Sequence, residues 1–545
     1  MTNSRWFATA LLVTALGACT NEKIVFKTRE PFNPPRDSIN GFLGYYTVGT
    51  KQTTCGNCHV DQQGAWKLTK HAEAWADLVG SGHQASYCNN CHSVSQLGNV
   101  VGDSTPAGYA KVADSTYFDV QCESCHGPGF THVQGPNPGN VPLARISIPT
   151  DTLVARTSAT CGACHTGIHE PFTEEWSQSP HAGTVSEVIS SYVTNPAGEA
   201  SCMACHEGRL TLKAWGVNTN YAERDQTINL ASAMPVVCAV CHDPHADNNA
   251  GQLRWPIDNA DPTQNLCMKC HNRRAVPSAS SPRGPHAPQG SVVLGTAGWW
   301  GANFVDTVPA THGNATANPR LCAGCHVNRV TVNDTATGNL AFQSVGHLFL
   351  PDPCLVAGKP TGNNCARPGD AGYVSGSRAF TGCALSGCHN SELQAENAVA
   401  SQRLIVAALA DALWDDNDAD ESLYDTIPGG KFSGFDAGDT GLLTQLDSAQ
   451  ADTAFNYKDG KVSVAEGVLF NVRLLGENRY ANGDGSKGAH NPLLYQQLLA
   501  TSVDQLKTRY GLPVPPAVQA LVDQTLRHVA QVRGRPAPAT KVSSR

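Results

Sequence analysis

Residues 236–246 of this chain read VVCAVCHDPHA, which places two cysteines and two histidines within eight positions. Two cysteines separated by two residues and followed at once by a histidine are typical of the covalent attachment of a c-type haem. In such a site the thiols bond to the porphyrin and the histidine ligates the iron. Cys238, Cys241 and His242 fit these roles, which leaves His245 to be explained.

The CxxCH pattern occurs eight times in the chain, and a longer variant, CALSGCH, occupies residues 383–389. We number these nine motifs 1 to 9 in chain order and expect one covalent haem c at each. The predicted attachment cysteines are Cys55, Cys58, Cys88, Cys91, Cys122, Cys125, Cys161, Cys164, Cys202, Cys205, Cys238, Cys241, Cys267, Cys270, Cys322, Cys325, Cys383 and Cys388. The predicted proximal iron ligands are His59, His92, His126, His165, His206, His242, His271, His326 and His389. Zinc and iron–sulfur sites also use these residue types, but neither requires a histidine directly after every cysteine pair.

The distal iron ligands are expected among the other histidines, because nine of the 20 histidines belong to motifs. Of the four methionines, Met203 and Met268 lie inside motifs, and Met1 belongs to the N-terminal segment that we interpret below as a signal peptide. Met234 is therefore the one methionine that is a candidate distal ligand. The predicted distal ligands are His71, His83, His132, His169, His181, His245, His286, His312, His347 and His490. His528 lies among charged residues and is expected on the surface.

The short spacing between His242 and His245 restricts what His245 can ligate. Three residue steps cover only about 10 Å of extended chain, and Pro244 restricts the path further. His245 therefore cannot reach the far face of the haem that His242 holds. We expect it to ligate a neighbouring haem; the alternative is a hydrogen bond to an axial ligand.

The N-terminal residues indicate export. Arg5 precedes an apolar run, residues 6–15, that is too short to span a bilayer and fits a signal peptide. The sequence LGAC, ending at Cys19, resembles a bacterial lipobox. We expect residues 1–18 to be a lipoprotein signal peptide, Cys19 to carry the lipid and residues 19–54 to form a tether. The alternative is an ordinary signal peptide. The expected location is the outer membrane, on its periplasmic or cell-surface face.

Two further cysteines, Cys354 and Cys365, lie outside the motifs in a loop rich in proline and glycine. In an oxidising compartment such cysteines usually pair, so we expect a disulfide, with free thiols as the alternative.

The motifs are organised as a threefold repeat. Cys55, Cys161 and Cys267 are spaced by 106 residues, and we expect haem modules at residues 55–160, 161–266 and 267–390. The first two modules share the pattern W-x-x-[ST]-x-H-A, which contains His71 and His181. The third has His286 in a comparable place without the tryptophan.

Residues 391–545 contain no cysteine, and several segments have helical periodicity. We expect a helical C-terminal domain that supplies His490 as a distal ligand. The predicted fold class is mainly α with extensive irregular loops, in which the haems themselves form much of the core. The formal net charge is −8 and there is no basic run, which argues against nucleic-acid binding.

The chain resembles the multihaem c-type cytochromes, the superfamily that includes pentahaem nitrite reductase and octahaem hydroxylamine oxidoreductase. The resemblance rests on CESCHGPG with the trailing His132, on the two W-x-x-[ST]-x-H-A segments and on GAHNP, which contains His490. It implies closely stacked haems and a late histidine, like His490, that reaches back to a haem. The nitrite reductases typically mark the active haem with a lysine, whereas every motif here ends in histidine.

These observations favour electron transfer by a nonahaem cytochrome on the cell envelope, with mostly bis-histidine haems stacked as a redox wire. One alternative is a reductase or oxidoreductase of a nitrogen or sulfur compound with one open haem. Another is a subunit of an extracellular electron conduit or a cytochrome filament. The expected partners are redox proteins or an extracellular electron acceptor, with possible self-assembly through the helical C-terminal domain.

Overall fold

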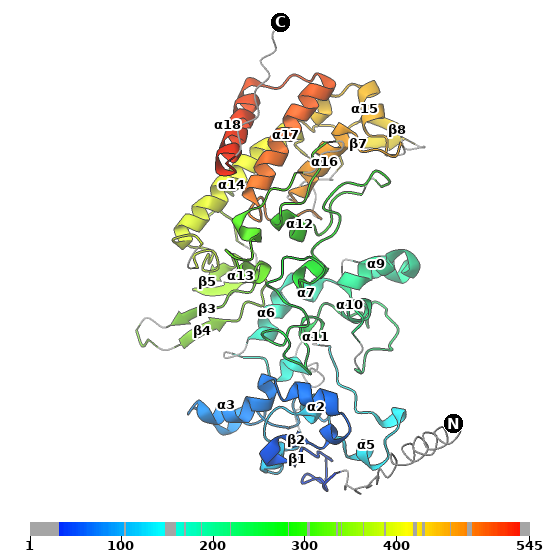
Figure 1. Cartoon of the computed structure of the whole chain (residues 1–545), viewed down its shortest axis with the longest axis vertical. Helices are drawn as coiled ribbons and strands as arrows, with labels where there is room; N and C mark the ends of the chain where they lie inside the picture. The colour runs from blue at the N-terminus through cyan, green and yellow to red at the C-terminus, as the bar shows by residue number, and fades with distance from the viewer. Residues whose placement is uncertain are drawn as a thin grey trace, which may run out of the picture.

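The structure is a computed structural model that describes residues 32–534, with gaps. The gaps are residues 103–104, 148–159, 168–170, 187, 218–219, 282, 302–305, 334–335, 339, 363–364, 386–387, 418–421, 428–430, 458 and 477–481. The molecule is elongated, with the first module at one end and a bundle of helices from the C-terminal part at the other (Figure 1). It is rich in helices and irregular loops, as the sequence predicts.

The first module contains short elements joined by long loops, in keeping with the 51 glycines and 33 prolines of the chain. Its helices are α2 (Val60–Trp66), α3 (Ala74–Gly80), α4 (Cys122–His126) and α5 (Phe130–Gln134). The residues just before the module form two antiparallel strands, β1 (Tyr45–Thr47) and β2 (Gln52–Thr53). One small core of Phe42, Val94, Ala107 and Tyr117 packs here.

The second module is also built from short helices. They are α6 (Phe172–Gln178), α7 (Pro180–Gly183), α8 (Ile189–Thr194), α9 (Pro196–His206), α10 (Gly208–Ala214) and α11 (Cys238–Cys241). Trp176, Leu212 and Tyr221 belong to a small buried cluster between them.

The third module adds two antiparallel hairpins. Its elements are α12 (Gln289–Val293), α13 (Cys322–His326), β3 (Val330–Asn333) paired with β4 (Leu340–Ser344), and β5 (Cys354–Val356) paired with β6 (Lys359–Thr361). Cys354 and Cys365 form a disulfide with a Cα–Cα distance of 6.0 Å, which confirms the predicted pairing.

The C-terminal part is a helical bundle with one antiparallel hairpin (Figure 1). Its elements are α14 (Glu392–Leu413), β7 (Tyr424–Ile427), β8 (Lys431–Phe435), α15 (Ser448–Ala454), α16 (Val464–Leu474), α17 (Pro492–Tyr510) and α18 (Pro516–Val532). Side chains close to the helix ends satisfy their backbone groups: Ser463 and Glu466 form a capping box before α16. Asn491 caps α17, and Gly511 ends it in the left-handed conformation.

The principal hydrophobic core lies in this bundle, where Leu409, Val468 and Leu498 are almost fully buried. The clusters within the first two modules are much smaller. Those modules therefore need another source of apolar packing, and porphyrin faces would supply it. None of the helices in the described part of the chain is both long and apolar enough to cross a membrane.

Candidate haem-binding sites

The motif cysteines are brought to the same side of the backbone by short helical turns. Motifs 1, 4 and 7 begin in 3-10 turns, at Cys55–Asn57, Cys161–Ala163 and Cys267–Lys269. Motifs 3, 5, 6 and 8 lie on α4, α9, α11 and α13. Residues three apart on a helical turn are neighbours on one face, so both thiols of such a motif can meet one porphyrin edge.

Among the residues that the structure describes, seven motif histidines each face a second histidine ring from a distant part of the chain. The pairs and their centroid separations are His165 with His71 (6.2 Å), His126 with His245 (6.1 Å), His271 with His181 (6.2 Å), His206 with His286 (6.2 Å), His242 with His347 (6.2 Å), His389 with His312 (6.5 Å) and His326 with His490 (5.9 Å). In every pair, the second ring belongs to a predicted distal ligand.

These separations match the space that one metal ion needs. With a nitrogen–metal distance of about 2.0–2.1 Å on each side, two imidazoles that ligate one ion from opposite faces have centroids about 6 Å apart. Directly stacked rings usually lie closer, as Trp75 and Phe118 do at 4.0 Å. The residues present therefore fit haem c: two thiols and a proximal imidazole from the motif, and a second imidazole opposite.

Hydrogen bonds at Nδ1 orient many of these rings. The Nδ1 atoms of His126, His206, His242, His312 and His326 lie 2.7–2.9 Å from the carbonyl oxygens of Pro142, Thr184, Gly251, Ala489 and Phe349. A ring that donates from Nδ1 keeps its Nε2 lone pair for a metal.

Burial favours the neutral form of the His71, His181 and His347 imidazoles, which is the form that binds metal. Desolvation, together with the neighbouring His165, lowers the pKa of His71 to about 4. Desolvation also lowers the pKa of His181 to about 3, and that of His347 to about 4.

The shared pattern W-x-x-[ST]-x-H-A has the same structural role in the first two modules. The indole N–H of Trp66 donates to the carbonyl of Val120 at 2.9 Å, and that of Trp176 donates to Val236 at 2.9 Å. Each carbonyl lies two residues before a motif cysteine. The two histidines of the pattern, His71 and His181, face the first motif histidine of the following module.

The His245 ring lies opposite His126 of motif 3. It does not lie opposite His242, the motif histidine of its own motif, whose facing ring is His347. It also lines a cavity with Asp61, Arg254 and Trp255. Its Nδ1 atom is 3.8 Å from Asp243 Oδ1, which is beyond hydrogen-bond distance.

Two acidic residues that hold predicted distal ligands were missed by the sequence interpretation. The Glu175 carboxylate accepts hydrogen bonds from the backbone N–H groups of Val345 (2.9 Å) and His347 (2.7 Å). Asp484 Oδ1 lies 2.6 Å from His490 Nδ1. Although burial lowers the pKa of His490, the charge and hydrogen bond of Asp484 raise it above its ordinary value. Glu175 lies on α6 and Asp484 lies in a loop, and neither carries a spacing signal that would have identified its role.

The seven pairs leave the motif histidines His59 and His92, and they do not use His83 or His132. His83 is exposed, and His132 Nδ1 lies 3.0 Å from Asn140 Oδ1. His169 lies outside the described residues, as do Cys19 and the leader. The alternative ligand Met234 is buried in the small cluster of the second module. His528 is exposed on α18, as expected.

The thiols of different motifs also approach one another. Hydrogen bonds join Cys55 to Cys122, Cys91 to Cys164, Cys161 to Cys238, Cys205 to Cys270, and Cys267 to Cys322. Three further pairs of thiols lie near enough for one to raise the pKa of the other: Cys125 and Cys161, Cys241 and Cys267, and Cys325 and Cys388. Together these hydrogen bonds and close approaches connect all nine motifs. In the first two modules, the last motif contacts the first: motif 3 contacts motif 1, and motif 6 contacts motif 4. In the third module, it is the middle motif, motif 8, that contacts the first one, motif 7.

Two segments match known family models. Residues 54–127 match the model for cytochrome c554 and c-prime, and residues 232–276 match the model for a doubled CXXCH motif. The first segment contains motifs 1 to 3, and the second contains motifs 6 and 7.

This chain is a multihaem c-type cytochrome. The cytochrome is 26% identical over 294 residues to the C-type polyheme cytochrome OmcB of Geobacter sulfurreducens, a match that covers 48% of this chain and 36% of OmcB. It is 22% identical over 238 residues to the multiheme cytochrome MtrA of Shewanella baltica, covering 41% of this chain and 61% of MtrA. The chain thus spans only about a third of the length of OmcB.

The crystal structure of the outer cell wall cytochrome OcwA aligns with a TM-score of 0.43 and 16% sequence identity, over 78% of this chain and 77% of OcwA.

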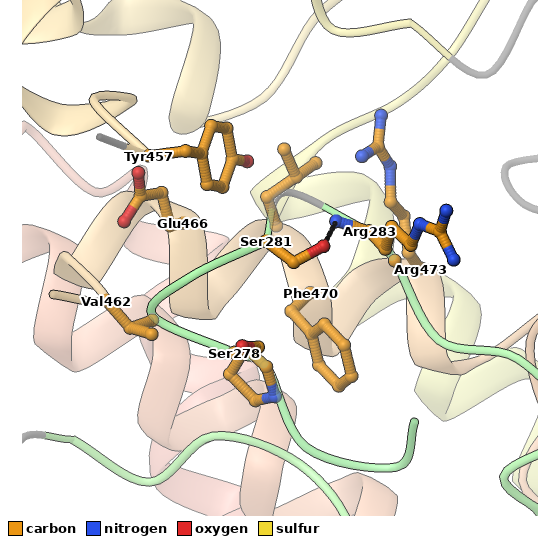
Figure 2. Close-up of a pocket in the computed structure, with 11 residues that line it drawn as sticks. Ser278, Ser281, Arg283, Tyr457, Val462, Glu466, Phe470 and Arg473 are labelled. Carbon is orange, nitrogen blue, oxygen red and sulfur yellow. Dashed lines mark hydrogen bonds between the residues drawn. The ribbon is translucent and has the colours of Figure 1, made fainter. Parts of the chain in front are cut away.

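A separate pocket lies between α16 and the loop residues 277–281 and 283–284 (Figure 2). Arg283 and Arg473 lie on one side of it, and Tyr457 and Glu466 on the other. Glu466 already accepts a hydrogen bond from the Ser463 N–H as part of the helix cap. The pocket contains no predicted haem ligand, so it is distinct from the haem sites.

Proposed function

We propose that this cytochrome transfers electrons along nine covalently attached haems, most of them ligated by two histidines. The observation that carries the proposal is the set of seven facing imidazole pairs. Haem c supplies a centre that accepts and releases one electron at a time. Two imidazoles held rigidly on either side change little when an electron arrives, which favours fast transfer.

The contacts between motifs support transfer over the length of the molecule. Thiols of neighbouring motifs lie within hydrogen-bonding distance, for example Cys161 and Cys238. Thioethers in those positions would bring the edges of neighbouring porphyrins together. We propose a path through motifs 1, 3, 4, 6, 7, 8 and 9, with motif 2 beside motif 4 and motif 5 beside motif 7.

The distal histidines also join the modules. His71 of the first module faces motif 4, and His245 of the second module faces motif 3. If both ligate iron, the first two modules are crosslinked in both directions. Such crosslinks would fix the spacing of the haems more firmly than the small hydrophobic clusters can.

A cell-envelope location is part of the proposal. The Cys354–Cys365 disulfide fits an oxidising compartment, and attachment of c-type haem takes place outside the cytoplasm. We propose that lipid on Cys19 tethers the protein to the outer membrane and that redox proteins or an extracellular acceptor exchange electrons with it. The helical C-terminal bundle would be available as a docking surface in a conduit or filament.

A reductase with an open iron is the second candidate. One observation favours it: the seven pairs do not include His59 or His92, so motifs 1 and 2 are where an open position would lie. His83, His132 and His169 are the histidines left to close them. An open site would bind nitrite, hydroxylamine or a sulfur compound at iron.

Low-temperature EPR of the oxidised, purified protein distinguishes the two functions. Electron transfer alone predicts only low-spin ferric signals, with nine haems per chain. A high-spin signal that shifts when nitrite or sulfite is added would overturn the carrier proposal in favour of the reductase.

A further inference from the structure

One of the facing pairs has an unusual hydrogen-bond partner. His490 donates from Nδ1 to a carboxylate, Asp484 Oδ1, at 2.6 Å. In comparison, His126, His206, His242, His312 and His326 bond at Nδ1 to backbone carbonyls. A charged acceptor forms a stronger hydrogen bond than a neutral carbonyl does.

The carboxylate is held firmly in place. The Asp484 side chain is fully buried, and the hydroxyl of Ser486 donates to its Oδ2 atom. The backbone of Asp484 is fixed as well, because its N–H donates to Leu474 at 2.9 Å and its carbonyl accepts from Gln289 at 3.2 Å. Asp484 therefore points at His490 through the packing of the C-terminal bundle.

The ring of His490 is fixed from the other direction. Its backbone N–H donates to the Ser486 hydroxyl at 3.2 Å, and Asn491, the next residue, caps α17. With Nδ1 engaged by the carboxylate, Nε2 is the nitrogen that would be available to an iron held by His490 and His326. The Asp484 carboxylate, the His490 imidazole and the iron would then follow one another in that order, so that only the imidazole touches the metal.

A carboxylate that accepts a strong hydrogen bond from the Nδ1–H group gives the imidazole partial anionic character. A more anionic ligand donates more electron density and stabilises ferric iron over ferrous iron. The buried negative charge acts in the same direction, because the ferric centre carries one more positive charge. Both effects make the iron harder to reduce.

We propose that Asp484 is a positioning residue that lowers the reduction potential of the haem at motif 8, held by His326 and His490. This inference rests on the proposed electron-transfer function and deepens it. It places a low-potential step between motifs 7 and 9, so that electrons would leave this site readily toward either neighbour. The C-terminal bundle would then set an energy profile as well as supply a ligand.

The test is Asp484→Asn in the full-length, haem-loaded protein, followed by spectropotentiometric titration. One haem should become at least tenfold easier to reduce, an increase of about 59 mV for a one-electron couple. The haem count and the low-spin EPR signals should not change. The shift should disappear in a Cys322→Ser/Cys325→Ser background, which lacks the haem of motif 8.

Ser486→Ala gives an independent test with the opposite sign. Losing the Ser486 hydroxyl removes one donor from the carboxylate, so Asp484 becomes a stronger acceptor for His490. The potential of the same haem should fall. This variant leaves both His490 and Asp484 in place, so it remains informative if Asp484→Asn does not fold.

Asp243→Asn is the matched control. Asp243 lies 3.8 Å from His245 Nδ1 and 3.3 Å from Arg254, so its carboxylate is near a facing histidine without bonding to its ring. This variant should shift every reduction potential by less than about 59 mV, which is less than a tenfold change in the reduction equilibrium. An equal shift in both aspartate variants would overturn the proposal, because general charge would explain it.

The inference and the function on which it rests fail in different ways. If the wild-type protein lacks a low-spin haem at motif 8, the proposed function is wrong at this site. If that haem is low-spin and Asp484→Asn leaves all potentials unchanged, only the inference is overturned. An increase in potential on Ser486→Ala would also overturn it.

Discussion

The imidazole rings of His245 and His126 face each other with centroids 6.1 Å apart, although 118 residues separate them in the chain. His245 lies three residues after the proximal histidine of its own motif and contacts the site of another. This arrangement joins the first and second modules through a shared pair of rings. The haem that His245 would ligate is therefore the one at motif 3.

We predict that His245→Ala converts one haem to high-spin or water-ligated iron. The variant removes the ring opposite His126 and leaves every attachment cysteine in place. EPR and visible spectra measure the spin state, and intact mass measures the haem count, which should stay at nine. His528→Ala, on the exposed face of α18, is the control and should leave all spectra unchanged. A fully low-spin His245→Ala protein would exclude His245 as a ligand.

The number of haems gives the second prediction. Intact mass of the mature protein should correspond to nine covalent haems, including one at CALSGCH. Cys383→Ser/Cys388→Ser should then lose one haem, because no thiol remains to attach the porphyrin at motif 9. A wild-type mass with eight haems, unchanged in the double variant, would show that CALSGCH is not an attachment site.

The third prediction concerns the membrane tether. Cys19→Ser should move the protein from the membrane fraction to the soluble fraction with its haems attached, because lipid is the anchor that we propose. Fractionation with haem staining measures this. Cys354→Ser/Cys365→Ser, which removes the disulfide and leaves Cys19, should stay in the membrane fraction. Membrane retention of Cys19→Ser would point to a protein partner instead of lipid.

Glu123, inside motif 3, gives a prediction about stability. Its buried carboxylate accepts hydrogen bonds from the backbone N–H groups of Leu43, Gly44 and Gly129 at 2.7–3.0 Å. Glu123→Gln presents an NH2 group to at least one of these donors and leaves it unsatisfied, at a cost of about 1–3 kcal/mol.

We therefore expect the urea midpoint of Glu123→Gln to fall, measured by the Soret band of the first module's haems. Asp77→Asn is the control, since Asp77 forms an exposed ion pair with Lys70 at 3.3 Å that contributes only about 0–1 kcal/mol. Equal midpoints for Glu123→Gln and the wild type would show that the carboxylate does not hold the N-terminal segment to motif 3.

The sequence by itself determined the local chemistry. The nine attachment motifs, the pool of distal histidines and the Cys354–Cys365 pairing can all be read from residue types and spacing. Helix ends in the C-terminal bundle were also predictable, because Asn491 and Gly511 act on backbone groups within a few residues of themselves. The Trp66 and Trp176 segments were recognisable as equivalent because they repeat within the chain.

Only the tertiary structure decided which histidines face each other. His326 and His490 are 164 positions apart, and no local rule constrains a ring across such a distance through loops of irregular conformation. The pairing depends on how the modules pack, since facing rings such as His206, His312 and His326 are positioned by backbone carbonyls from other segments. Asp484 shows this most clearly: in the sequence it is an aspartate between two glycines, and packing of the bundle places it 2.6 Å from His490.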